Sequence, residues 1–422
     1  MTTPSSAWAA IRGVPLTVFL VSLGSWTLTN VDQSLFGYAI PGVRADFGVD
    51  LNTIGWILSV SFAVAVFAAI AIGMLADRYG RKIMLIISLG SSAVLVGLQG
   101  FAPDVWTLAA LRLLSFGMSN GVATIVITYT AEAAPARYRG LMTGFLAIGY
   151  PVGWFAASLA AAPVMAAYGW RAMFLLAFLV VPFVFVLVRW LPESRRFETA
   201  RAAGPPQRPW QEQLKLLFSP ALRRRTLFCL ASTFTFGGAY SSTAFYFPTF
   251  YTEVRGYSQA DATTIVGLSY GIGLIGYIGS AIVSEYVLTR RNTLIVWYWI
   301  GSLGMLGLIW LPRSYGQDIF WFGAMATFFY GSQAVLGTWL SELFPTEVRA
   351  TGGAFSGTGG LYLGFSVFPV ITSYLVGAVG WQWAFTIIAV PLGLLAGLAL
   401  FGTDNQKSGL DLQDQVAPQS TP

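Results

Sequence analysis

The chain of 422 residues has no histidine and one cysteine, Cys229. Without histidine it has neither a histidine proton relay nor a histidine metal site, and one cysteine excludes an internal disulfide and a cysteine metal cluster. Charged residues are also scarce, at 10% of the chain, where a soluble protein carries about 25%. Hydrophobic residues make up 55%, and the mean hydropathy is +0.66. This composition cannot cover a surface in water, so we predict a polytopic membrane protein.

Hydrophobic runs long enough to cross a bilayer as helices follow one another along most of the chain. We expect twelve, at residues 14–43, 52–76, 83–101, 105–131, 141–167, 170–191, 226–252, 262–286, 293–311, 319–343, 353–379 and 383–401. The predicted fold is therefore all-α, with a cytoplasmic tail at 1–13, a first six-helix bundle at 14–191, a cytoplasmic linker at 192–225, a second bundle at 226–402 and a disordered cytoplasmic tail at 403–422. A short surface helix is predicted inside the linker, at 211–217.

The basic residues fix a predicted orientation, because positive charge collects on the cytoplasmic side. If loops alternate between the two sides, one side holds only Arg44, Arg171, Arg255 and Arg313, and nearly all the other Lys and Arg residues lie on the opposite side. We therefore expect a multi-pass protein of the cell (inner) membrane with both termini in the cytoplasm. The net charge of +6 then requires no nucleic-acid partner.

The chain also repeats itself. Glu132, followed by Pro135 and Arg139, recurs as Glu342, followed by Pro345 and Arg349, at an offset of 210. Further pairs recur at nearly the same offset: Asp77 with Glu285, Pro41 with Pro248, and Gly169-Trp170 with Gly380-Trp381. A constant offset across the chain predicts two similar halves of six helices each.

A charged decapeptide separates the second and third hydrophobic runs: Gly73-Met74-Leu75-Ala76-Asp77-Arg78-Tyr79-Gly80-Arg81-Lys82. It resembles the loop between helices two and three of major facilitator superfamily transporters. The resemblance implies two pseudo-symmetric bundles related by an axis along the membrane normal, with a substrate site near the midplane between them. It also implies inner gate networks, which here would comprise Asp77, Arg78, Arg81, Glu132 and Arg139 in one half and Glu285, Arg290, Glu342 and Arg349 in the other. Alternatively, each of these residues only anchors a helix end electrostatically.

Two charged residues, Asp32 and Arg112, fall well inside predicted spans. Counted at about 1.5 Å per residue from the outer helix ends, they lie at similar depth. A charge inside the membrane is expensive and is normally functional. We expect the two side chains to be partners, so that Asp32 takes up a proton when Arg112 turns to an anionic substrate. The alternative is a permanent structural ion pair.

The segments around these two residues carry a closer resemblance. Thr29-Asn-Val-Asp32-Gln-Ser-Leu-Phe-Gly-Tyr-Ala-Ile-Pro41 is similar to helix one of the aromatic acid and metabolite proton symporters, and Arg112-Leu-Leu-Ser-Phe-Gly-Met-Ser-Asn-Gly121 resembles their helix four. Those transporters usually carry two acids three residues apart in helix one, whereas this chain has Thr29 and Asp32. The resemblance implies import of a small organic anion by alternating access, driven by the proton gradient without a cofactor or a metal.

The substrate would bind between Arg112, which holds the anion, and stacking rings. The further candidates are polar or aromatic residues of the predicted spans: Asn30, Gln33, Tyr38, Asn120, Tyr240, Tyr246, Trp321, Tyr330 and Gln333. Aromatic residues make up 15% of the chain, so the alternative for each ring is to face lipid or to pack.

Two other transport functions stay open. Pro192-Glu193-Ser194 also recurs in sugar porters, which favours a sugar or polyol proton symporter, and Gly149-Tyr150-Pro151 partly resembles the motif of drug/proton antiporters. The sequence offers no pairing of a nucleophile with a base and no extramembrane domain, so nothing in it supports an enzyme. We therefore expect a monomeric carrier whose partners are a small anionic molecule, protons and the bilayer.

Overall fold

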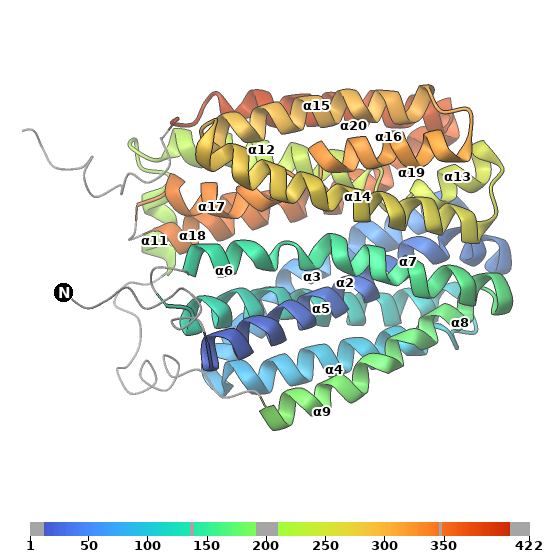
Figure 1. The fold of residues 1–422 in the computed structure, drawn as a ribbon, viewed down its shortest axis with the longest axis horizontal. Coiled ribbons are helices and arrows are strands. Elements are labelled where there is room, and N and C mark those ends of the chain that lie inside the picture. The colour runs from blue at the N-terminus through green and yellow to red at the C-terminus, as the bar shows by residue number, and fades with distance from the viewer. Residues whose placement is uncertain (1–11, 136–138, 191–209, 346–347, 406–422) are drawn as a thin grey trace, which may run out of the picture. The chain divides into compact units, whose positions relative to one another are not determined.

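The computed structural model describes residues 12–135, 139–190, 210–345 and 348–405 (Figure 1). Within these ranges every regular element is a helix, so the predicted all-α class is confirmed. Ten helices of the described chain are long and apolar enough to cross a membrane. They include most of the twelve predicted spans.

Seven predicted spans are single unbroken helices. These are α2 (Val14–Phe47), α3 (Leu51–Tyr79), α4 (Arg81–Gln99), α5 (Val105–Ala133), α14 (Gln259–Tyr286), α15 (Arg290–Trp310) and α20 (Trp381–Leu400). The predicted linker helix at 211–217 is also present, as α11 (Trp210–Leu217).

The other five spans are built from shorter pieces. They are α6 (Arg139–Leu146) with α7 (Gly149–Tyr168); α8 (Trp170–Phe174), η2 (Leu175–Leu179) and α9 (Val180–Trp190); α12 (Arg223–Ser241) with α13 (Phe247–Arg255); α16 (Tyr315–Phe328) with α17 (Gln333–Leu343); and α18 (Arg349–Gly352), the π-helix η3 (Gly353–Gly359) and α19 (Gly360–Val379). The break between α12 and α13 has a local cause, because Pro248 has no N–H and its ring clashes with the preceding helical turn.

The repeat is visible in the backbone. Gly169 and Gly380 end α7 and α19 with φ of 82° and 80°, a left-handed conformation that favours glycine. Each is followed by a tryptophan that begins the next helix, Trp170 in α8 and Trp381 in α20. The same chain reversal is therefore made by the same two residue types in both halves.

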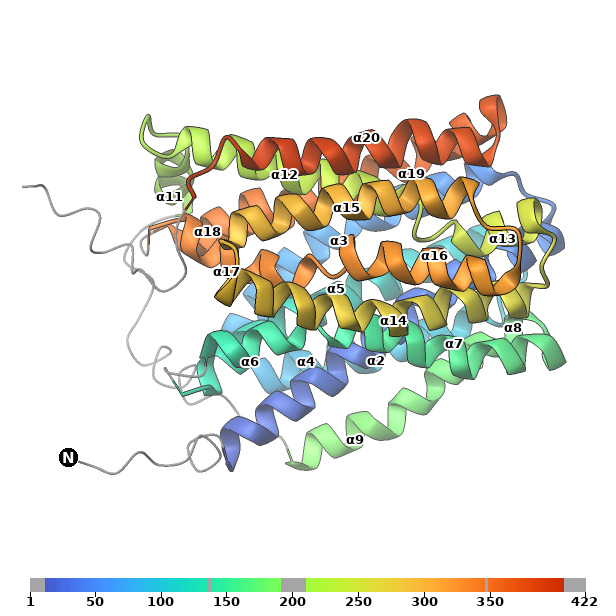
Figure 2. The ribbon, with the colours of Figure 1, turned by 45° about the horizontal axis from the view of Figure 1, so that its top comes forward.

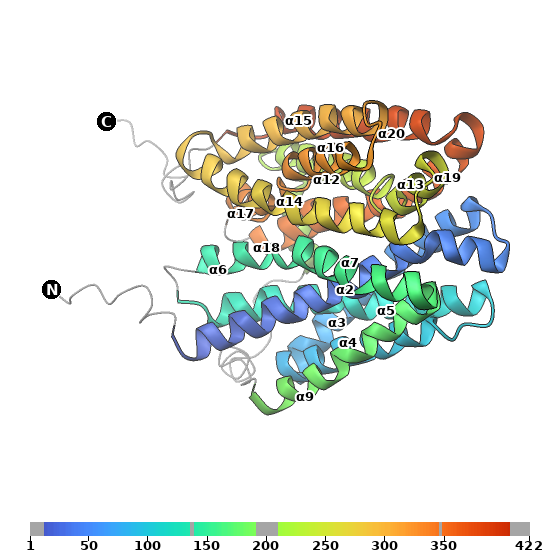
Figure 3. The same ribbon diagram turned by 45° about the vertical axis from the view of Figure 1, so that its right-hand side comes forward.

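The described chain forms two compact units. The first comprises Met1–Pro205, Ser242–Gly271 and Pro369–Trp381. In it α5 packs against α2, α3 and α4, while α2 also packs against α7 (Figure 1). The helix α9 lies beside α4, as Figure 3 shows. Three helices thus pack against α5, the helix that carries Arg112.

The second unit comprises Pro206–Ser241, Ile272–Phe368 and Gln382–Pro422. In it α15 lies beside α16 (Figure 2), and α12 packs against η3. The helices approach closely at Gly276, where an added Cβ would lie 1.7 Å from the Thr327 carbonyl oxygen. The first unit also includes two segments of the predicted second bundle, Ser242–Gly271 and Pro369–Trp381. The division into two six-helix bundles stays a prediction.

Candidate functional site

Arg112 is buried in the first compact unit, with 1% of the residue exposed. Its helix starts at Asp104, whose carboxylate accepts hydrogen bonds from the N–H groups of Trp106 and Thr107. The Arg112 Cζ atom lies 4.6 Å from the Phe36 ring centroid and 4.4 Å from that of Phe116. The rings attract the cation through their electron-rich faces, by about 2 kcal/mol or more for each ring where water is excluded.

The rings do not satisfy the guanidinium. Arg112 Nε and Nη2 are buried and have no hydrogen-bond partner within the described ranges. Leaving a buried charged donor unsatisfied costs more than the roughly 1–3 kcal/mol of a neutral one. A carboxylate can accept two parallel hydrogen bonds from a guanidinium. Arg112 is therefore a buried cation with two donors that an anion would satisfy.

Asp32, on α2, is held by hydroxyl groups. Ser92 Oγ donates to Asp32 Oδ2 at 3.2 Å, and Ser92 Oγ lies 2.5 Å from Ser119 Oγ. Asp32 and Arg112 are close enough for their charges to interact, but in the part of the chain that the structure describes no ion pair joins them. The two charged residues that the sequence predicts as partners are thus neighbours. The Asp32 carboxylate is hydrogen-bonded to Ser92, and the Arg112 guanidinium lies against the rings of Phe36 and Phe116.

A cluster of aromatic rings continues from this site within the same unit. Phe62 contacts both Phe116 and Phe245, with ring centroids 4.8 and 5.4 Å away. Phe245 lies 5.7 Å from Trp154, which stacks on Tyr270 at 4.8 Å. The Trp154 indole is fully buried, and its Nε1 has no hydrogen-bond partner in the described chain. The rings thus form a continuous series of contacts from Phe116, beside Arg112, to Trp154 and Tyr270.

The remaining candidates of the first half are buried on α2 and α5. Asn30 and Asn120 donate to the carbonyl groups of Trp26 and Phe116 one turn earlier, at 2.7 and 2.8 Å. Gln33 is 7% exposed. Tyr38 donates its hydroxyl to the Trp154 carbonyl at 2.9 Å, and its ring lies 5.7 Å from that of Trp154. Tyr38 therefore joins the aromatic cluster.

The substrate-binding candidates of the second half do not form one group in the structure. Tyr240 and Tyr330 are together in the second unit, with ring centroids 4.9 Å apart, and Gln333 follows at the start of α17. Trp321 instead packs on α15 at Gly307. Tyr246 lies in the first unit, where its hydroxyl donates to the Pro369 carbonyl at 2.9 Å. The structure thus brings together one predicted pair of rings.

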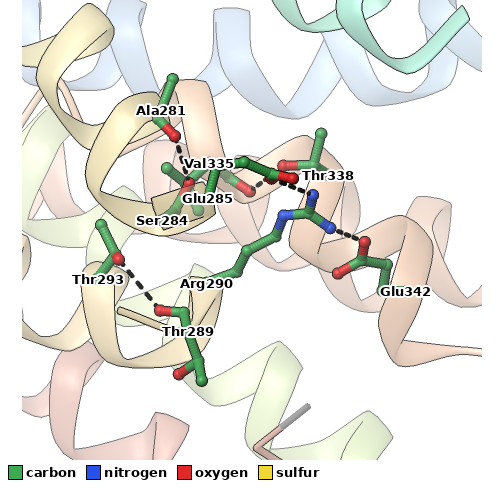
Figure 4. Close-up of polar contacts among 9 residues, drawn as sticks. All are labelled: Ala281, Ser284, Glu285, Thr289, Arg290, Thr293, Val335, Thr338 and Glu342. Carbon is green, nitrogen blue, oxygen red and sulfur yellow. Dashed lines mark hydrogen bonds and ion pairs between the residues drawn. The ribbon is translucent and has the colours of Figure 1, made fainter. Parts of the chain in front are cut away.

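The predicted inner gate residues form ion pairs within each half. Arg81 Nη2 lies 3.2 Å from Glu132 Oε1. In the other half Arg290 bridges two acids: Glu285 Oε2 is 3.0 Å from Nη2, and Glu342 pairs with Nη1 (Figure 4).

Two further gate residues have contacts of a different kind. Arg78 is exposed and lies over the Tyr79 ring. Arg349 Nε donates to the Phe344 carbonyl at 3.4 Å. The side chains of Asp77 and Arg139 lie outside the described part of the structure.

Several residues of the site do not figure among the sequence candidates. For two of them a signal exists: Phe36 follows Asp32 by four residues and Phe116 follows Arg112 by four, the spacing that places side chains on one helix face. Ser92, Ser119 and Trp154 have no comparable signal, because serine and aromatic residues are frequent throughout the chain. Outside this site, in the second unit, a further charged residue is fully buried. It is Asp318, which lies one residue before a predicted span, in the first turn of α16.

The chain is similar to known transporters. The model of the Major Facilitator Superfamily matches residues 16–360. The chain is 30% identical to a 3-(3-hydroxy-phenyl)propionate transporter of Escherichia coli (strain K12), covering 94% of this chain and 95% of that protein. It is 25% identical to a niacin transporter of Acinetobacter baylyi, over 93% and 95%, and 27% identical to a gallate transporter of Pseudomonas putida, over 89% of each.

Solved structures share this fold. The chain superposes on an inward-facing, unoccupied bacterial homologue of the human lysosomal transporter Spinster with a TM-score of 0.70. The identity is 15%, and the match covers 93% of this chain and 99% of the other. At this identity the likeness concerns the fold alone.

Proposed function

This chain belongs to the Major Facilitator Superfamily and is a transporter rather than an enzyme, and we propose that it imports a small aromatic or otherwise planar organic acid together with protons. The observation that carries the proposal is the guanidinium of Arg112, which is buried between two phenyl rings with Nε and Nη2 unbonded. Relatives named for niacin, gallate and 3-(3-hydroxy-phenyl)propionate support an aromatic acid as the cargo.

In the proposed binding step the substrate carboxylate accepts hydrogen bonds from Arg112, and its planar part lies against the aromatic cluster. A bidentate pair with arginine fixes the carboxylate in the plane of the guanidinium. In the proposal the planar group stacks on one or more of the rings of Phe116, Phe62 and Phe245, and each such pair of rings contributes about 0.5–1.5 kcal/mol beyond the area that it buries. Tyr240 and Tyr330 of the second unit remain proposed contacts.

Proton coupling is assigned to Asp32. A bound anion neutralises Arg112, whose positive charge otherwise stabilises the ionised Asp32 carboxylate. A buried carboxylate without a compensating cation favours its protonated form. Substrate and proton then bind together and cross together. Alternating access, a location in the inner membrane and cytoplasmic termini complete the proposal, with the proton gradient as energy source and no cofactor.

The test is uptake by the purified full-length chain in proteoliposomes with an imposed pH gradient. The substrates are radiolabelled niacin, gallate and 3-(3-hydroxyphenyl)propionate, with glucose and a lipophilic cationic drug representing the two rival functions. We expect the acids to accumulate in vesicles with the wild-type protein. Arg112→Ala should abolish this accumulation, because it removes the group that binds the carboxylate. Arg313→Ala, which changes an exposed arginine, is the matched control. Accumulation of only the sugar or the drug, or full acid uptake by Arg112→Ala, would overturn the proposal.

A further inference from the structure

Asp32 is connected to a pair of serines that the coupling model above does not use. Ser92 on α4 donates to Asp32 Oδ2 at 3.2 Å, and Ser119 on α5 lies 2.5 Å from Ser92 Oγ. All three side chains are at most 1% exposed. Three helices therefore contribute one group each to a short buried chain of hydrogen bonds that ends on the proposed proton acceptor.

The chain of hydroxyls has two orientations, one for each state of Asp32. An ionised carboxylate only accepts, so Ser92 must give its single hydrogen to Asp32, and Ser119 must then donate to Ser92. A protonated Asp32 can donate to Ser92 through Oδ2, which frees the Ser92 hydrogen for Ser119. Both states are thus hydrogen-bonded without any movement of heavy atoms.

The other groups around Asp32 do not replace this contact. Its second oxygen, Oδ1, is buried and has no hydrogen-bond partner among the described residues. Among the described residues, the charged side chain that acts on Asp32 is Arg112 on α5, and the hydrogen bond to its carboxylate comes from Ser92 on α4. Removing Ser92 therefore removes that hydrogen bond and leaves the interaction with Arg112.

We propose that Ser92, oriented by Ser119, is the positioning residue for proton coupling at Asp32. This inference rests on the proposed function, since it presupposes that Asp32 carries the proton. Ser92 does not touch the substrate in this proposal. Its hydroxyl holds the carboxylate in place and stabilises it by a hydrogen bond in both protonation states, so that a proton is gained and lost at one fixed position.

The test separates coupling from folding by two readouts on the same proteoliposomes, with radiolabelled 3-(3-hydroxyphenyl)propionate as the probe. One is accumulation driven by a pH gradient, and the other is counterflow of labelled for unlabelled probe without a gradient. For Ser92→Ala we expect the ratio of accumulation to counterflow to fall about tenfold, because Ser92 bonds the ionised carboxylate more strongly than the protonated acid and its loss shifts the balance between the two states. Ser119→Ala should lower the ratio less, because the bond from Ser92 to Asp32 stays.

Ser88→Ala is the matched control. Ser88 lies one turn earlier on α4, is fully buried, and its Oγ has no hydrogen-bond partner in the described structure, so its removal should leave the ratio unchanged. A ratio for Ser92→Ala equal to that of Ser88→Ala, including a parallel loss of both activities, overturns the inference. Should Ser92→Ala fail to reach the membrane, an unchanged ratio in Ser119→Ala overturns it. A wild-type protein that shows counterflow without accumulation would instead refute the proposed function.

Discussion

An ion pair between the two predicted halves offers a direct test of alternating access. Arg44, near the end of α2, pairs with Glu253 of α13. The second oxygen of Glu253 accepts a hydrogen bond of 2.7 Å from Trp381 Nε1. We predict that Arg44→Glu favours the conformation open at the predicted outer side, because two acids would then meet where an acid and a base hold the helices together.

The expected size follows from the exposure of the pair. The side chains of Arg44 and Glu253 are 24% and 42% exposed, and solvent-exposed ion pairs contribute about 0.2–1 kcal/mol. Charge reversal removes that contribution and adds a repulsion of similar size. The total is at most about 2 kcal/mol, which changes the ratio of the two conformations by up to about 30-fold.

The assay is cysteine accessibility in intact cells. Cys229 is buried and is replaced by alanine, and Ser59→Cys serves as reporter. Ser59 is 4% exposed, and its Oγ accepts a hydrogen bond from the Val370 N–H at 3.2 Å, a contact between the two halves. A membrane-impermeant maleimide should modify the reporter several times faster in Arg44→Glu, and addition of Glu253→Arg should slow the reaction again.

A second ion pair on the same side provides the control. Asp46 pairs with Arg171 and accepts a hydrogen bond of 2.9 Å from Trp170 Nε1, all within the first half. Arg171→Glu disturbs a similarly exposed pair without touching the second half, so the reporter should react at the wild-type rate. Equal rates in Arg44→Glu, Arg171→Glu and wild type would refute the reasoning.

Two further predictions concern coupling and packing. Asp32→Asn, which keeps the shape of the side chain but cannot ionise, should abolish accumulation driven by a pH gradient while counterflow persists, and undiminished accumulation would contradict the role of Asp32. Gly276→Ala should destabilise the protein by about 1–3 kcal/mol, seen as a lower unfolding temperature in detergent, because the new Cβ meets the Thr327 carbonyl oxygen at 1.7 Å. Gly279→Ala on the same helix meets nothing within 4 Å, and an equal loss there would show that packing is not the cause.

The fold was largely predictable because each span had to be apolar over its full length. What the hydrophobic runs did not predict is where a span breaks. The run at 226–252 reads as one helix, yet it divides into α12 and α13 at the residues before Pro248. The proline was a visible signal, and the polar residues Ser241, Ser242 and Thr243 beside it were another.

The outer contacts were beyond prediction for a different reason. The alternation of loops assigned Arg44 and Arg171 to one side, but it could not say which acid each would meet. Asp46 and Glu253 are 207 residues apart, the same offset as Pro41 and Pro248. Each accepts a hydrogen bond from a tryptophan that follows a glycine of positive φ. The repeat could thus have predicted the carboxylate–indole pairs, whereas the ion pair across the halves depends on tertiary packing.

At the site, the depth of a residue in the membrane could be predicted from the sequence, but its contacts could not. Counting residues from the helix ends puts Asp32 and Arg112 at one level, and the structure keeps them close enough to interact. The rotation of each helix and the choice of rotamer decide the rest. Arg112 lies between Phe36 and Phe116, which leaves its Nε and Nη2 donors without a partner in the described chain. A direct ion pair through Nε and Nη2 would have used those donors, so the proposed binding of an anion depends on an arrangement that depth could not predict.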